Sequence, residues 1–95
     1  MMVKIYVRLL GDLREALGKE RLEIELPRNS SLKDLIENNL LKYEGLTDHI
    51  IDPMTKKIRS DLIILINDRS IEGFVESERV KDGDIITLAS VVAGG

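Results

Sequence analysis

Four segments of the chain carry the apolar pattern of β-strands. In residues 3–9 every second side chain is apolar, and residues 22–26 repeat this alternation up to Pro27. A period of two places the apolar side chains on one face of a strand. Residues 62–66 are apolar at every position, which is typical of a strand in the middle of a sheet. Residues 85–92 are expected to form the last strand.

One segment has the spacing of an amphipathic helix. Across residues 31–43, apolar side chains recur three and four positions apart, which places them on one helical face. These side chains are those of Leu32, Leu35, Ile36, Leu40 and Tyr43. Ser31 and Asp34 have the arrangement of a capping box at the start of this helix. Gly45 is expected to end it. An earlier end is the alternative, because Asn38 and Asn39 are poor helix formers.

Shorter elements lie between these segments. Residues 13–17 are expected to form a helical turn, with Asp12 as its N-cap and Gly18 as its left-handed stop. Residues 70–75 are expected to hold a short strand that Gly73 interrupts.

Two polar clusters are expected to be tight turns. They are residues 67–69 and residues 81–84. Asp82 and Asp84 bring two carboxylates together, so a metal site is an alternative for the second cluster. Gly83 favours a turn, because glycine adopts positive φ and aspartate side chains bond to nearby backbone.

The segment 46–60 has no stable period, and both a loop and a short helical turn fit it. His49 is expected to serve a surface or packing role there. The basic residues at positions 56–59 are interpreted as solvated loop charges, with steering of an anionic partner as the alternative.

The order strand, strand, helix, strand, short strand, strand predicts an α+β domain. The first and last strands are expected to pair in parallel at the centre of a mixed four- to five-stranded sheet, with one main helix packed across it. The first two strands are expected to pair as neighbours. This is the ubiquitin-like β-grasp arrangement; a ferredoxin-like fold would need a second helix. Residues 1–95 are expected to form a single domain, with residues 91–95 as a flexible tail.

Composition limits the chemistry of the chain. It has 95 residues, no cysteine and one histidine, which argues against disulfides, thiolate metal sites, a thiol nucleophile and a Ser-His-Asp triad. The net charge of −3 argues against a nucleic-acid binder. No apolar run is long enough to cross a membrane, and the alternating N-terminus does not resemble a signal peptide. We therefore expect a cytoplasmic protein.

The C-terminal residues are the candidate for chemistry. Val92, Ala93, Gly94 and Gly95 are small and uncharged, so they could enter a narrow channel on another protein. The Gly95 carboxylate has no steric shield and could attack the α-phosphate of ATP to give an acyl adenylate. The alternative is a Gly-Gly end that arose by chance, because termini tolerate glycine.

Several motifs match one known family. The chain resembles the MoaD/ThiS-type ubiquitin-like sulfur carriers, and within them the small subunit of molybdopterin synthase. The motifs are residues 7–18, 31–35, 65–68, 80–85 and 92–95. The Leu-Arg-Glu segment inside the first motif favours the molybdopterin branch. The residues before the tail lack that branch's aromatics and prolines and are closer to the thiamine branch. The archaeal small modifier proteins are also similar.

This resemblance implies a function. An E1-like enzyme of the MoeB or ThiF type would use ATP to adenylate Gly95. A sulfur donor of the cysteine desulfurase or rhodanese type would then convert the adenylate to a thiocarboxylate. The sulfur would pass to a pterin precursor beside a MoaE-type large subunit, or to a thiazole precursor or a tRNA base; the alternative fate is an isopeptide bond to a lysine.

In this scheme the chain is not an enzyme on its own, and it binds no metal and no cofactor. An interaction module without any such chemistry is the remaining alternative. The docking surface is predicted beside the tail, from Ile71, Phe74, Leu88 and Ala89. Core packing is the alternative for Leu88 and for Phe74.

Overall fold

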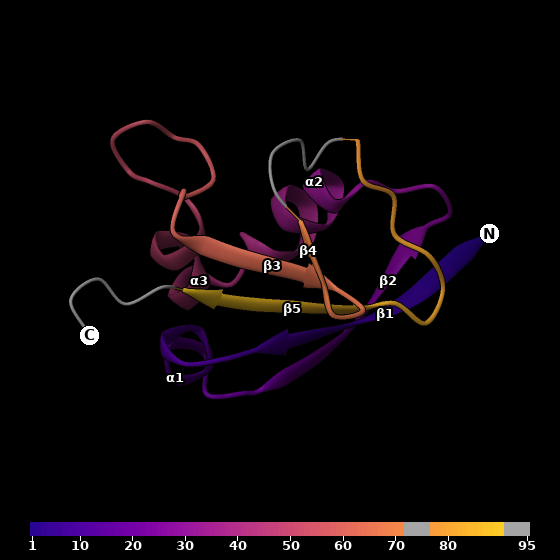
Figure 1. The fold of residues 1–95 in the computed structure, drawn as a ribbon, viewed down its shortest axis with the longest axis horizontal. Helices are drawn as coiled ribbons and strands as arrows, with labels where there is room; N and C mark the ends of the chain where they lie inside the picture. The colour runs from indigo at the N-terminus through magenta and orange to yellow at the C-terminus, as the bar shows by residue number, and fades with distance from the viewer. Residues whose placement is uncertain (72–76, 91–95) are drawn as a thin grey trace.

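The computed structural model describes residues 1–71 and 77–90, and five strands form one mixed sheet within them (Figure 1). The strands are β1 (Met2–Leu9), β2 (Arg21–Pro27), β3 (Leu62–Ile66), β4 (Arg69–Ile71) and β5 (Ile85–Ser90). Their order in the sheet is β2-β1-β5-β3-β4. β5 pairs in parallel with β1, and the other neighbouring pairs are antiparallel. The predicted β-grasp arrangement and its parallel central pair are confirmed.

The apolar alternation gives the sheet one buried face. In β1 and β2 every second side chain is buried, apart from the half-buried Val3, and in β5 Ile86 and Leu88 are fully buried. The buried aliphatic side chains of the sheet and of the helical segments form one cluster. This cluster explains how a chain with 3% aromatic residues builds a core: aliphatic side chains pack densely enough to fill it.

The predicted helix over residues 31–43 is present in part. The capping box is confirmed, because the Ser31 hydroxyl accepts from the Asp34 amide at 3.0 Å and the Asp34 carboxylate accepts from the Ser31 amide at 3.0 Å. After one α-helical turn, α2 (Leu32–Leu35), the chain widens into a π-helix, η1 (Ile36–Leu40). In η1 the Leu41 amide donates to the Ile36 carbonyl at 3.0 Å. The predicted helix is therefore present over residues 32–40, but it is α-helical only in its first turn and ends before Tyr43; its apolar face packs into the core as expected.

Gly45 does not end this helix. It is the second residue of α3 (Glu44–Ile50), which packs against α1 (Asp12–Leu17). A Cβ at Gly45 would lie 2.8 Å from the carbonyl oxygen of Ala16. Glycine is needed here for close approach of two helices, not for a stop signal.

The N-cap prediction for α1 was also wrong. Asp12 is the first residue of the helix, and the cap is Gly11 at φ 57, without a side-chain hydrogen bond. Gly18 ends the helix in the left-handed conformation, at φ 77, as predicted.

The predicted turn at residues 67–69 joins β3 to β4. Asn67 and Asp68 have φ values of 50 and 72, the pattern of a two-residue hairpin turn. Of the predicted strand at residues 70–75, the described part ends with β4 at Ile71, and Gly73 lies outside the described residues. β5 is described as far as Ser90.

Candidate functional site

The end of β5 is the part of the structure nearest in sequence to the predicted reactive residues. Val92, Ala93, Gly94 and Gly95 lie outside the described residues. Ser90, the last described residue of β5, pairs with Leu62 at the start of β3. α1 contacts β5, and α1, α3 and the loop after α3 lie at this end of the sheet (Figure 1).

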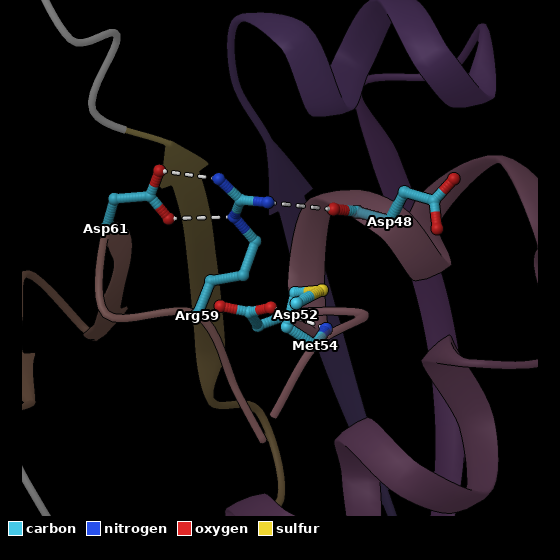
Figure 2. Close-up of polar contacts among 5 residues, drawn as sticks. All are labelled: Asp48, Asp52, Met54, Arg59 and Asp61. Carbon is cyan, nitrogen blue, oxygen red and sulfur yellow. Dashed lines mark hydrogen bonds and ion pairs between the residues drawn. The ribbon is translucent and has the colours of Figure 1, made fainter. Parts of the chain in front are cut away.

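An ion pair stabilises the chain at the start of β3, the end of that strand which pairs with Ser90 of β5. Arg59 donates from Nε to Asp61 Oδ1 at 2.9 Å and from Nη2 to Asp61 Oδ2 at 3.1 Å. Figure 2 shows the same guanidinium pointing also at the backbone carbonyl of Asp48 in α3, which it reaches at 3.5 Å. The hydrogen bond from Arg59 lowers the pKa of Asp61, and the bond to Asp61 raises the pKa of Arg59. The bidentate pair orients the chain where it enters β3.

The loop between α3 and β3 projects from the sheet and is closed by backbone hydrogen bonds at its base (Figure 1). Ile51 and Ile58 form an isolated bridge at its base. Asp52 organises the tip, because its carboxylate accepts from the Met54 amide at 2.8 Å (Figure 2). Its carbonyl also accepts from the Lys56 amide at 2.8 Å. Met54 is 89% exposed. The segment without a stable sequence period is thus helical in its first part and a closed loop in the rest.

The sheet face opposite the core carries apolar side chains across its middle. Ile63 and Ile85 are each 40% exposed, and Leu65 and Ala89 are half-buried. Ile63 lies directly opposite Ala89, and Leu65 directly opposite Thr87. We call Ile63, Leu65, Ile85 and Ala89 the apolar strip. It runs over β3 and β5 toward the end of β5.

The four predicted docking residues are distributed over different places. Ala89 lies in the apolar strip. Leu88 has no exposed surface, so it packs in the core and offers nothing to a partner. Ile71 is partly buried against the core, opposite Ile64. Phe74 lies outside the described residues.

Sequence reasoning missed Ile63, Leu65 and Ile85 as surface residues. The sequence signal that could have identified surface residues in β3 was the absence of apolar–polar alternation in that strand. An inner strand apolar at all positions, such as residues 62–66, buries one set of side chains and must place the other set on the opposite face.

The aspartates of the 81–84 turn bond to backbone and to one asparagine. The Asp82 carboxylate accepts from the Lys4 amide at 2.8 Å. Asp84 accepts from the Lys81 amide and from the Asn67 side chain, both at 2.8 Å. Gly83 has φ 86. These contacts are those of the predicted turn.

Two kinds of feature are absent from residues 1–71 and 77–90. No three histidine or acidic residues gather there in a way that could hold a metal ion. No helix in the same part of the chain has the length and apolar character needed to span a membrane.

Comparisons with known proteins agree with this architecture. The chain is 28% identical over 93 residues to the molybdopterin synthase sulfur carrier subunit of Drosophila yakuba, covering 98% of this chain and 92% of that one. The solution structure of small archaeal modifier protein 1 from Methanosarcina acetivorans superposes with a TM-score of 0.80 at 27% identity, over 100% of this chain and 99% of the other. The complex of subunits 1 and 2 of the molybdopterin-converting factor from Helicobacter pylori 26695 contains a chain that matches with a TM-score of 0.63 at 28% identity, over 100% of both chains.

A family model covers most of the sequence. The model of the ThiS family matches residues 7–95, from the first strand through Gly95. The match includes the end of β1 and the whole of β5, which pair at the centre of the sheet, and the resemblance seen in the sequence motifs agrees with it. The chain therefore belongs to the ThiS family, among the ubiquitin-like sulfur carriers.

Proposed function

We propose that this protein carries sulfur as a thiocarboxylate on Gly95 and delivers it in molybdopterin synthesis, as the small subunit of a molybdopterin synthase. The observation that carries the proposal is the family match, which runs through Gly94 and Gly95. The similarity to a molybdopterin synthase sulfur carrier subunit supports the choice of pathway.

The proposed chemistry takes place at one carbon. A Gly95 carboxylate oxygen attacks the α-phosphorus of ATP in the active site of an E1-like enzyme of the MoeB or ThiF type, and pyrophosphate leaves. The outer sulfur of a persulfide on a cysteine desulfurase or rhodanese-type donor then attacks the carboxyl carbon, and AMP leaves with its oxygen. A thiol reduces the resulting acyl disulfide, which releases the thiocarboxylate and leaves a disulfide on the donor side. One oxygen is replaced by sulfur. Since the chain has no cysteine, the carboxyl carbon is the position at which it can carry activated sulfur.

The described residues supply the proposed docking surface for these partners. The apolar strip leads to Ser90, and Ile63 and Ile85 expose the most surface within it. A related chain is found in complex with a second subunit in the Helicobacter pylori structure. We propose that a MoaE-type large subunit covers the strip and receives the tail. We place the protein in the cytoplasm, where ATP and the sulfur donor are available.

Intact-protein mass spectrometry tests this proposal. The chain is incubated with ATP, sodium sulfide and the E1-like enzyme encoded in the same genome. We expect a mass increase equal to the replacement of one oxygen by sulfur. Deletion of Gly94 and Gly95 abolishes it, and the control variant Lys57→Ala, in the exposed loop, retains it. A mass increase that survives the deletion would contradict the proposal.

A second fate for the same tail is conjugation to proteins. The similarity to small archaeal modifier protein 1 over the whole chain favours it as a second candidate. In that case the Gly95 carboxyl group forms an isopeptide bond with a lysine of a target. Proteomics of cells that express the chain would find a remnant of the tail on lysines, and deletion of Gly94 and Gly95 would remove the remnant.

A further inference from the structure

Two arginines occupy paired positions on neighbouring strands, on the open side of the sheet. Arg8 of β1 and Arg21 of β2 are directly paired in the antiparallel ladder, and both are exposed. The neighbouring pair, Leu9 and Glu20, is joined by a backbone hydrogen bond of 2.9 Å. Arg8 and Arg21 therefore occupy a non-hydrogen-bonded position, where opposing side chains come closest. Like charges in this arrangement destabilise the sheet.

The neighbouring carboxylates pair with other cations. Glu20 lies 3.9 Å from Arg14, and Glu23 of β2 lies 4.0 Å from Lys4. Within the described residues, neither Arg8 nor Arg21 forms an ion pair with a carboxylate. Lys4 and Glu23 are diagonal neighbours across β1 and β2. Tyr6 and Arg21 are diagonal neighbours in the same direction, and the Arg21 guanidinium lies over the Tyr6 ring, 4.5 Å from its centroid.

The two arginines border a hollow that joins the apolar strip. It has a volume of about 250 Å³, and Arg8, Arg21, Tyr6 and Ile85 are among its lining residues. Ile85 also belongs to the strip. Arg8 pairs with Thr87 of β5, which leads directly to the end of the strand. The lining thus combines two arginines with apolar side chains, on the same sheet face as the strip. It also includes Glu20, whose carboxylate pairs with Arg14.

We infer that Arg8 and Arg21 form a clamp for an acidic side chain of the adenylating enzyme that handles the tail. This inference rests on the proposed function. A carboxylate between two guanidinium forks accepts bidentate hydrogen bonds from either one, and it removes the repulsion between them. The Tyr6 ring and Ile85 fit the aliphatic stem of a glutamate or aspartate better than they fit a free inorganic anion. The clamp extends the proposed interface from the apolar strip onto β1 and β2.

Two other interpretations of the arginine pair are outcomes of the test. β2 is an edge strand, and charged side chains on edge strands protect sheets from aggregation. A pair of arginines can also hold free phosphate. Neither interpretation requires that the arginines affect how the carrier binds to its enzyme.

The test compares two double variants with equal loss of charge. Arg8→Gln with Arg21→Gln removes the clamp. Arg28→Gln with Lys57→Gln removes two exposed cations at other places, beyond the far end of β2 and in the loop after α3.

Pyrophosphate release by the E1-like enzyme is measured against carrier concentration. We expect the clamp variant to raise KM about tenfold with kcat unchanged, the effect of losing a charge-assisted hydrogen-bonded pair. The control variant keeps the KM of the original chain.

Further measurements separate the outcomes. Arg8→Lys with Arg21→Lys keeps the charge without the planar forks, so we expect an intermediate KM. Equal KM values for the clamp and control variants would overturn the inference while leaving adenylation, and the proposed function, intact. Absence of adenylation in the original chain would overturn both.

Aggregation of the clamp variant with an unchanged KM of its monomer would assign the arginines to edge protection. Arginine side-chain NMR shifts on adding submillimolar sodium phosphate to the free chain would assign them to a free anion; both results overturn the clamp.

Discussion

Leu88 and Ile63 lie on adjacent strands but on opposite faces of the sheet, so their truncation to alanine separates stability from docking. Leu88 pairs with Ile64 and points into the core, while Ile63 pairs with Ala89 on the open face. We expect Leu88→Ala to destabilise the fold and leave the affinity for the adenylating enzyme unchanged. We expect Ile63→Ala to do the reverse.

The expected magnitudes follow from the exposure of the two side chains. Leu88 is 0% exposed, and truncation of such a leucine removes about 2–5 kcal/mol of stability. A chain of 95 residues has a free energy of unfolding of roughly 5–14 kcal/mol, so this loss is a large fraction of the total. It corresponds to a decrease in Tm of roughly 10 °C or more. Ile63 is 40% exposed, so its truncation removes about 1 kcal/mol or less.

Two assays read out the two properties. Urea unfolding followed by far-UV circular dichroism gives the free energy of unfolding of each variant. Adenylation by the E1-like enzyme, measured at a temperature where both variants are folded, gives KM for the carrier. We expect Ile63→Ala to raise KM about fivefold or more, as a contact near the centre of an interface does. The reasoning is refuted if Ile63→Ala destabilises the fold more than Leu88→Ala does.

Three further predictions concern the framework around the site. Gly45→Ala places a Cβ 2.8 Å from a backbone carbonyl of α1, so we expect a loss of about 1–3 kcal/mol by urea unfolding; a variant at least as stable as the original chain would contradict the close approach. Hydrogen bonds from the backbone and side chain of Ser31 lower the pKa of Asp34 below its ordinary 3.8. Its stabilising effect is therefore complete above that value and is lost as pH falls through the lower, folded pKa. Asp34→Asn should accordingly be less stable than the original chain at neutral pH and converge with it in strong acid; a pH-independent difference would contradict this. Arg59→Ala should speed amide hydrogen exchange at the start of β3 without changing the urea midpoint, because both side chains of its ion pair keep more than a third of their surface in solvent; a lower midpoint would show that the pair supports the whole fold.

The sequence predicted the sheet well because its strands obey simple patterns. Alternation in residues 3–9 and 22–26 predicted β1 and β2, and two apolar strands far apart in the chain predicted the parallel centre. Turns such as residues 67–69 were predictable because a few polar residue types tolerate positive φ.

The helical region was less predictable because tertiary contacts determine it. Residues 36–40 form a π-helix that keeps the same side chains buried, so periodicity alone did not distinguish it from an α-helix. Gly45 had the appearance of a stop signal, and the approach of Ala16 from another helix accounts for it. The clamp of Arg8 and Arg21 depends on strand register, which the separate sequence segments do not specify.

The position of the sulfur tests the central proposal most directly. The chain is purified from its native cells under conditions that preserve thiocarboxylates, and its C-terminal peptide is sequenced by tandem mass spectrometry. The proposed function predicts one sulfur in place of one oxygen on Gly95, absent from cells that lack the E1-like enzyme. A Gly95 carboxylate with unchanged oxygen content in cells that are actively making molybdopterin would contradict it.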